Sequence, residues 1–292
     1  MPSQHNFRIP LFERLEIETQ SICNRTCWFC PRTYDRSGAY ITKTGAPTLR
    51  QMPTHKVIDL LDQASQLKFC GFVAFHFYSE PLLDERNILF AKAARTRGMK
   101  PLLHTNGDVL NKNDTLCEQI RQVYDCVVVG LYDYTNVEEL TAAKEFWKNR
   151  LDGVDLKFSY IRPVDDRRLP SMGIPRALVP TDRRAAIPDL IFKNGPCSRP
   201  LLRMLVRYDG AFCLCCEDLH AQFGLGNVYE SSLDDLWYSD RHVRVIGDLL
   251  AGHRSSYRLC EQCPQSPTGP ARGLEKIEIS RREYLAAVGS SH

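Results

Sequence analysis

Three cysteines near the start of the chain, Cys23, Cys27 and Cys30, are spaced C-x3-C-x2-C in the string CNRTCWFC. Three thiolates at this spacing can hold three irons of a [4Fe–4S] cube, whereas such clusters are normally closed by four cysteines. The fourth iron would then be open to a small molecule. A set that stops at three therefore predicts a cluster that binds its substrate, rather than one that only carries electrons.

Two other uses of these thiols compete with the cluster. A tetrahedral zinc site takes four ligands and usually pairs C-x2-C with a distant second pair. A disulfide set belongs to an oxidising compartment. However, no signal peptide precedes the cysteines, and no apolar run is long enough for a membrane span. The cluster is favoured over both alternatives, and the chain is expected to be cytoplasmic.

The composition is that of an ordinary folded protein. Of 292 residues, 43% are hydrophobic and 25% are charged, and the length suits one large domain with a small appendage. The formal net charge of +3 is too small to argue for nucleic acid or an anionic membrane as a partner. Twelve cysteines in such a chain favour metal binding over disulfides.

Short apolar strands alternate with amphipathic helices over the first two-thirds of the chain. Strands are expected at residues 15–19, 71–77, 100–105, 126–131 and 156–161, and helices at 54–69, 84–97, 114–124 and 137–147. This alternation predicts an α/β fold with a parallel sheet, in which the chemistry lies at the carboxyl ends of the strands. Residues 162–196 show no period and are interpreted as connection and lid. A strand near 201–207, a turn at Asp209 and Gly210, and a helix near 233–250 should follow.

The cysteine string, with the aromatic Phe29 before its last member, resembles the signature of the radical S-adenosylmethionine (SAM) enzymes. The resemblance covers most of the chain and implies a partial (β/α)6 TIM-like barrel. In that family the open iron chelates the amino and carboxylate groups of SAM, and the reduced cluster cleaves SAM to a 5′-deoxyadenosyl radical. The cofactor-binding residues that this resemblance implies are Phe29, Ser79, Glu80, Thr105, Asn106 and Tyr132.

A second group of cysteines resembles the C-terminal extension of the SPASM and twitch subgroup of these enzymes. Because no cysteine follows Cys263, the shorter twitch form is implied, a β-hairpin plus helix with one auxiliary [4Fe–4S] cluster. The implied ligands are Cys197, Cys215, Cys260 and Cys263. Cys213 or Cys216 could replace Cys215, and a four-cysteine zinc knuckle stays open. The expected division is a core at 1–196, a twitch domain at 197–270 and a tail at 271–292.

Strings such as FHFYSEPLL and GHRSSYRLCEQC resemble the dehydrogenases of antibiotic biosynthesis within this subgroup, which oxidise a secondary alcohol on a cyclitol. The resemblance implies an oxidoreductase that converts an alcohol of an amino-cyclitol or aminosugar-like substrate to a ketone. SAM would be the co-substrate, the auxiliary cluster the electron acceptor, and a flavodoxin or ferredoxin-type protein the reductant. His104 and Cys216 stand where that family has aromatic residues. The alternatives are a maturase that modifies a ribosomally made peptide and a non-catalytic metal-binding protein.

The dehydrogenase reaction needs a base for the hydroxyl proton, and three catalytic residues are expected: His104, Tyr78 and Arg168. His104 is preferred because an imidazole titrates near neutrality and this one ends a strand. An ordinary histidine of the barrel rim is an equal alternative. Arg168, or a neighbouring arginine, represents the family's substrate arginine in residues 162–196. His76 is a further candidate that could equally belong to the core.

Overall fold

The computed structural model describes residues 9–27, 29–35, 37–41, 49–134, 137–159, 195–261 and 263, together with Arg282 and Ala286. Arg168 and most of the expected tail at 271–292 lie outside the described residues, and their predicted roles stay predictions. Among the described residues, no helix has both the length and the apolar run needed to cross a bilayer.

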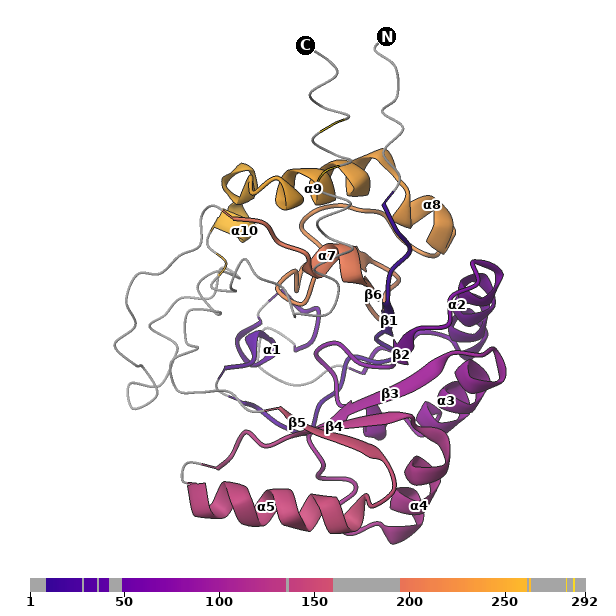
Figure 1. Ribbon diagram of the computed structural model, residues 1–292, viewed down its shortest axis with the longest axis vertical. Coiled ribbons are helices and arrows are strands. Elements are labelled where there is room, and N and C mark those ends of the chain that lie inside the picture. Colours follow the sequence, from indigo (N-terminus) through magenta and orange to yellow (C-terminus); the bar gives the residue numbers. More distant parts are fainter. Residues whose placement is uncertain are drawn as a thin grey trace.

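A single seven-stranded sheet, in the order β5-β4-β3-β2-β1-β6-β7, organises the described residues (Figure 1). All neighbouring strands pair in parallel except β6 and β7, which are antiparallel. The strands are β1 (Arg14–Ile17), β2 (Phe72–Ala74), β3 (Lys100–Thr105), β4 (Cys126–Gly130), β5 (Asp155–Ser159), β6 (Arg203–Val206) and β7 (Phe212–Cys213). The expected α/β class with a parallel sheet is confirmed.

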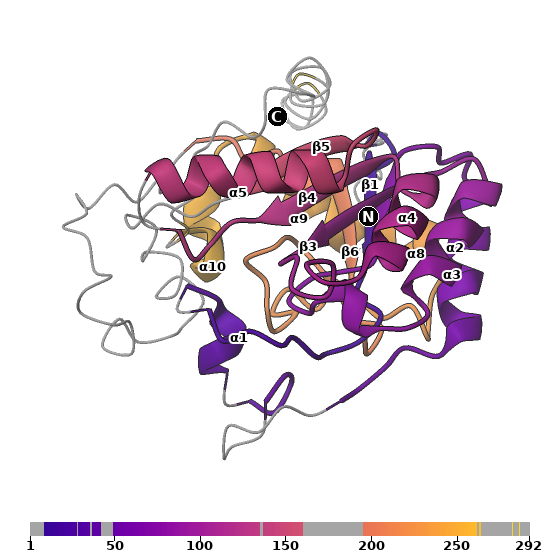
Figure 2. The same ribbon diagram turned by 90° about the horizontal axis from the view of Figure 1, so that it is seen from below.

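The main helices cover one face of this sheet, and the short helix α1 (Pro31–Tyr34) lies on its other side (Figures 1 and 2). The covering helices are α2 (Thr54–Gln66), α3 (Asn87–Thr96), α4 (Asp114–Val123) and α5 (Val137–Arg150). The Asn113 side chain accepts a hydrogen bond from the Leu116 N–H and so caps the start of α4. Main-core side chains such as Val57 and Phe90 fill the space between helices and sheet.

Strand alternation on β1 separates an apolar face from a polar one. On β1, Leu15 and Ile17 point into the main core, whereas Arg14 and Glu16 point to the opposite face, as residues two apart in a strand must. Glu18, just past β1, continues this polar row and is fully buried. The inner face of the sheet therefore carries charged groups, although it is enclosed, and this is where the site lies.

The C-terminal part continues the same sheet. Helix α7 (Arg199–Leu202) leads into β6, which pairs in parallel with β1, and a turn at Gly210 leads into β7. Gly210 has a φ of +84°, and a Cβ there would come within 2.4 Å of the Asn227 side chain. Helices α8 (Leu233–Trp237), α9 (Asp240–Leu250) and α10 (Arg258–Glu261) follow, with a 3-10 turn at Arg254–Ser256. The expected hairpin plus helix is present.

Three elements differ from the expectation. The helix expected at 233–250 is two helices, because Ser239 accepts a hydrogen bond from the His242 N–H and starts a new one. The segment expected as a strand at 201–207 begins in helix α7 and becomes strand only from Arg203. The strand expected at 71–77 pairs with its neighbours only over β2, so the residues after Ala74 lie beyond the paired part of the strand. The sixth parallel strand also comes from beyond residue 197 and lies beside β1.

Candidate functional site

The three N-terminal cysteines lie in the loop after β1 and line one cavity, of about 390 Å³, called here the first cavity. All three are partly exposed. The loop turns back on itself, because the Cys30 N–H bonds the Cys27 carbonyl and the Thr33 hydroxyl bonds the same carbonyl. Predicted site residues that line this cavity are Phe29, His76, Tyr78, Ser79, Glu80, His104, Thr105, Asn106 and Tyr132. The structure thus brings together residues from the ends of four strands.

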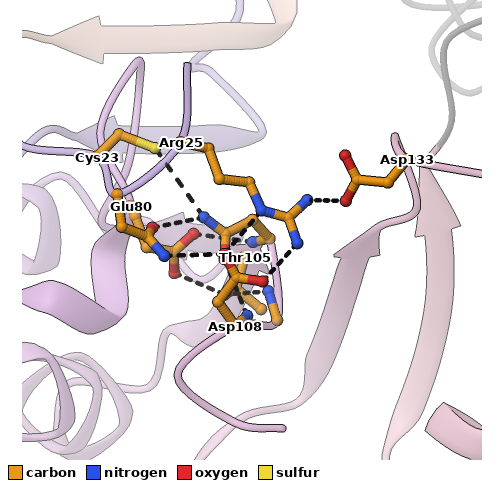
Figure 3. Close-up of polar contacts among 9 residues, drawn as sticks. Cys23, Arg25, Glu80, Thr105, Asp108 and Asp133 are labelled. Carbon is orange, nitrogen blue, oxygen red and sulfur yellow. Dashed lines mark hydrogen bonds and ion pairs between the residues drawn. The ribbon is translucent and has the colours of Figure 1, made fainter. Parts of the chain in front are cut away.

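Two side chains that were not expected from the sequence hold the cysteine loop in place (Figure 3). Arg25, between the first two cysteines, donates from Nε to Asp108 at 2.8 Å and forms an ion pair with Asp133 at 2.8 Å. Hydrogen bonding to Arg25 lowers the pKa of Asp108 below its usual value. The only sequence signal was the position of Asp108 directly after Thr-Asn-Gly at the end of β3. These contacts tie the loop to the ends of β3 and β4.

Glu80 and its neighbours form the polar wall next to the cysteines. The Glu80 carboxylate accepts hydrogen bonds from the Thr105 hydroxyl at 2.6 Å and from the Asn106 N–H at 2.8 Å. Burial raises the pKa of Glu80 to about 6, although both hydrogen bonds act in the opposite direction. The Asn106 amide nitrogen lies 4.0 Å from the Cys23 sulfur. Three of the residues expected to contact SAM are therefore mutually connected at the cluster loop.

Aromatic and imidazole rings form the next part of the cavity wall. Phe29 packs edge-on against Tyr132 with ring centres 4.9 Å apart. The Tyr132 hydroxyl lies 3.1 Å from His104 Nε2 and 2.7 Å from the Ser159 hydroxyl. The rings of His76 and His104 are 5.0 Å apart. The predicted binding residues Phe29 and Tyr132 thus adjoin the predicted base His104.

The expectation that His104 titrates near neutrality is not met. Burial lowers the pKa of His104 to about 3 and that of His76 to about 4, because the charged imidazolium would lose its hydration. Both rings are therefore neutral at physiological pH, and each is a weak base. The prediction rested on the ordinary pKa of an imidazole, whereas this ring lies in the wall of the first cavity.

Tyr78 joins the first cavity to the C-terminal part of the chain. Its hydroxyl donates to the Cys216 carbonyl, and its N–H donates to Glu18 at 2.8 Å. Glu18 also accepts from the Tyr40 hydroxyl at 2.9 Å, and burial raises the pKa of Glu18 to about 7. As a base, Tyr78 would have to exchange its bond to Cys216, so this geometry favours a structural role.

The four C-terminal cysteines expected to bind the auxiliary cluster line a second, apolar cavity, called here the auxiliary cavity. Its cysteines are Cys197, Cys215, Cys260 and Cys263. The Glu217 N–H donates to the Cys215 sulfur at 3.4 Å, the kind of bond that stabilises a ligating thiolate. Burial raises the pKa of the Cys260 thiol, and the neighbouring Cys197 and Cys263 raise it further. This donor set suits a centre of positive charge.

The two cysteines that flank Cys215 face elsewhere. Cys213 is fully buried beside Asp218 and Glu18 and does not line the auxiliary cavity. Cys216 lines the first cavity, and its sulfur lies 3.5 Å from the guanidinium of Arg199, a residue that lines the auxiliary cavity. The geometry therefore favours Cys215 as the ligand. Among the described residues, no three His, Cys, Asp or Glu side chains are spaced to hold a single metal ion.

Comparison with known proteins identifies the class. A model of the radical SAM superfamily matches residues 17–164, just over half of the chain, and a model of the SPASM iron–sulfur cluster-binding domain matches residues 197–264. The chain belongs to the radical SAM superfamily. Its core is of the kind that binds SAM and a [4Fe–4S] cluster, and its C-terminal part is of the kind that binds auxiliary iron–sulfur clusters.

A particular relative stands out among curated proteins. The S-adenosyl-L-methionine-dependent 2-deoxy-scyllo-inosamine dehydrogenase of Niallia circulans is 27% identical over 257 residues, which cover 87% of this chain and 93% of the relative. The crystal structure of BtrN in complex with AdoMet and 2-DOIA matches with a TM-score of 0.68 and 22% identity, covering 89% of this chain and 97% of BtrN. Native anSMEcpe with bound AdoMet matches with a TM-score of 0.52 and 14% identity, covering 96% of this chain and 98% of anSMEcpe. The chain is a radical SAM enzyme homologous to a SAM-dependent dehydrogenase.

Proposed function

We propose that this enzyme oxidises a secondary alcohol of an amino-cyclitol or aminosugar-like substrate to a ketone. The observation that carries the proposal is the position of Cys215 and Cys216. Cys215 lines the auxiliary cavity, and its neighbour Cys216 lines the first cavity beside the three N-terminal cysteines. A substrate in the first cavity would therefore lie between the two iron–sulfur sites, as an oxidation with an internal electron acceptor requires.

The cofactors would supply the radical and the electron acceptor, and the side chains of the first cavity would bind SAM and remove the hydroxyl proton. When bound, SAM and the first cluster supply a radical that removes hydrogen from the carbon bearing the hydroxyl, and the auxiliary cluster accepts the electron released as the ketone forms. Glu80 and Asn106 would hold the polar end of SAM, and Phe29 and Tyr132 would enclose it. The hydroxyl proton must pass to a base, for which His104 and Arg168 remain candidates.

The test is turnover with exclusion of air. The reconstituted protein, SAM and dithionite are mixed with a panel of amino-cyclitols and aminosugars that includes 2-deoxy-scyllo-inosamine, and the products are measured by mass spectrometry. We expect one ketone per 5′-deoxyadenosine. The variant Cys23→Ala should form neither product, whereas Cys215→Ser should form 5′-deoxyadenosine without ketone. Formation of 5′-deoxyadenosine with no ketone from any member of the panel would overturn the proposed oxidation.

We further propose an acidic flavodoxin or ferredoxin-type protein as the redox partner. A groove of about 390 Å³ lies beside the auxiliary site, and three exposed arginines, Arg241, Arg244 and Arg258, line it. No acidic side chain lines this arginine groove among the described residues. Leu259 lines both the groove and the auxiliary cavity, so one side chain separates them. Positive charge at a redox site steers acidic carriers into small, transient interfaces.

The enzyme is also proposed to work in a reducing, cytoplasmic compartment. None of the twelve cysteines forms a disulfide. Free thiols persist where glutathione and thioredoxin keep them reduced, and iron–sulfur ligation needs them in that state.

A further inference from the structure

One wall of the first cavity is built from side chains to which the reaction outlined above assigns no role, apart from the candidate base His104. They project from the inner face of β1, β3 and β6 and from the residues after β2: Arg14, Glu16, His76, His104 and Arg203. We call this set the strand wall. All five line the same cavity as the cysteines, so a substrate in that cavity meets them directly.

The strand wall carries an excess of positive charge. Glu16 is buried between the Arg14 Nη1 at 3.4 Å and the Arg203 Nη1 at 3.3 Å. Although burial acts against it, the Arg203 guanidinium, with a smaller contribution from Arg14, lowers the pKa of Glu16, so this carboxylate is ionised. Two guanidinium groups thus face one carboxylate. The two histidines add no charge, because burial keeps both imidazoles neutral.

No other carboxylate balances this excess among the described residues that line the cavity. Glu80 is the only other acidic lining residue there, and it is held by Thr105 and Asn106 beside the cysteine loop. Each arginine uses Nη1 for Glu16, and a guanidinium has five N–H donors in a planar fork. Donors therefore remain on both arginines for a second anion.

A buried polar atom on the same wall also points to a ligand. His76 Nδ1 is buried and has no hydrogen-bond partner among the described residues. Buried polar atoms without a partner are rare in folded proteins, because leaving one unpaired costs the whole of its desolvation. A neutral imidazole can donate from this nitrogen to an oxygen of a bound molecule.

We propose that the strand wall binds an acidic substituent of the substrate, a carboxylate or a phosphate, through Arg14, Arg203 and His76. The inference rests on the proposed function, since it takes the first cavity as the substrate site. Guanidinium groups bind such anions through paired, charge-assisted hydrogen bonds. An ammonium group on this wall would instead face unbalanced positive charge. Any amine of the substrate therefore lies away from the wall.

Binding without turnover tests this inference separately from the oxidation. The reconstituted protein with SAM and no reductant is titrated by calorimetry with glucosamine, glucosamine 6-phosphate and glucuronic acid. We expect at least one acidic sugar to bind ~10-fold or more tightly than glucosamine, a ratio equal to about 1.4 kcal/mol. The comparison of glucosamine 6-phosphate with glucuronic acid distinguishes phosphate from carboxylate.

Two variants with opposite expected effects separate binding from a purely structural ion triad. Arg203→Met should remove the preference for acidic sugars, whereas Glu16→Gln, which releases both guanidiniums, should strengthen it. Arg121→Met, on the exposed side of α4, is the matched control and should change neither. Equal binding of the three sugars, or a preference in Glu16→Gln no stronger than in the parent, would overturn the inference. Tighter binding of the acidic sugars would leave this inference standing even if no member of the amino-cyclitol and aminosugar panel yields a ketone, which is the outcome that overturns the oxidation.

Discussion

Cys213, Cys215 and Cys216 lie within four residues of one another but face three different surroundings. Cys213 is buried beside Asp218, Cys215 lines the auxiliary cavity, and Cys216 lines the first cavity. The sharp turn after β7 separates them, since the Asp218 N–H bonds back to the Cys215 carbonyl and the Asp218 carboxylate accepts from the Leu214 N–H. Their neighbourhoods, rather than their spacing, decide which thiol can bind iron.

Iron content provides the first prediction at this scale. Two four-iron clusters would give ~8 irons per chain, and Cys215→Ser should lower this to ~4 because the auxiliary site loses one of its four thiolates. The matched variant Cys213→Ser should keep the full count. Iron and sulfide are measured after anaerobic reconstitution. A loss of four irons from Cys213→Ser, with none from Cys215→Ser, would reverse the ligand assignment.

His242 gives the second prediction, on pH. Its Nδ1 donates to the Trp237 carbonyl at 2.7 Å, and burial lowers its pKa to about 4. An unfolded histidine takes up its proton near pH 6.5, so the folded state loses stability as the pH falls from 6.5 towards 4. This loss of unfolding free energy is on the order of 3 kcal/mol at full extent. We expect His242→Gln to flatten the accompanying fall in melting temperature, measured across the same pH range. An equally steep fall in the variant would assign the effect to other groups.

At the scale of the elements, the loop between β1 and α2 is fastened at several points. Arg25 connects it to the ends of β3 and β4, and the Tyr40 hydroxyl donates to Glu18, the residue that directly follows β1. The Tyr208 hydroxyl donates to the Ala39 carbonyl, and the Asp35 carboxylate accepts from the Tyr40 N–H at 3.1 Å. The cysteine loop is thus positioned by the core and by the C-terminal part together.

Tyr78→Phe tests whether the Tyr78 hydroxyl has a structural role, through its hydrogen bond to Cys216, or acts as the general base. The variant loses the hydrogen bond to the Cys216 carbonyl, which should lower the free energy of unfolding by about 1–2 kcal/mol. With a structural role, kcat at low temperature should stay within ~3-fold of the parent, whereas loss of a general base costs ~100-fold or more. Melting temperature and ketone formation are measured on the same samples. A 100-fold loss of kcat with an unchanged melting temperature would make Tyr78 the base.

The elements also show what the sequence can predict. The strand at Lys100–Thr105 agrees with its expected bounds, because its apolar run has clear breaks on both sides. The helix expected at 233–250 is divided, since the capping contact of Ser239 depends on one side chain that periodicity ignores. The cysteines and the strand-end residues were found by spacing. Arg25, Asp108 and the strand-wall residues Glu16 and Arg203 were not, because their contacts join residues far apart in the chain.

At the scale of the whole molecule, both expected iron–sulfur sites, the first cavity and the arginine groove belong to one continuous structure. The C-terminal part contacts the segment that precedes β1. The Trp237 indole donates to the Pro10 carbonyl at 3.1 Å and packs edge-on against Phe12. The Glu18 N–H bonds the Val206 carbonyl at 2.8 Å and extends the β1–β6 pairing towards the cysteine loop.

The arginine groove gives the prediction at this scale. The triple variant Arg241→Ser, Arg244→Ser, Arg258→Ser should slow electron exchange with reduced flavodoxin ~10-fold at low ionic strength, because steering by these charges is lost. The difference should shrink as salt is added, since exposed charges are screened. Stopped-flow absorbance measures both rates, with Arg121→Ser as the control. Equal rates and equal salt dependence in parent and triple variant would place the docking site elsewhere.

The pairing of β6 with β1 has a consequence for how this enzyme can diversify. If the auxiliary region were joined by a linker, it could be exchanged between relatives as an independent unit. Here an exchange would cut the sheet between β1 and β6 and expose the unpaired N–H and C=O groups of β1 as an aggregation-prone edge. New substrates are therefore more accessible through side chains facing the first cavity than through recombination of the two halves. Relatives that diversify in this way would keep the same distance between the two proposed iron–sulfur sites, because the shared sheet sets that distance.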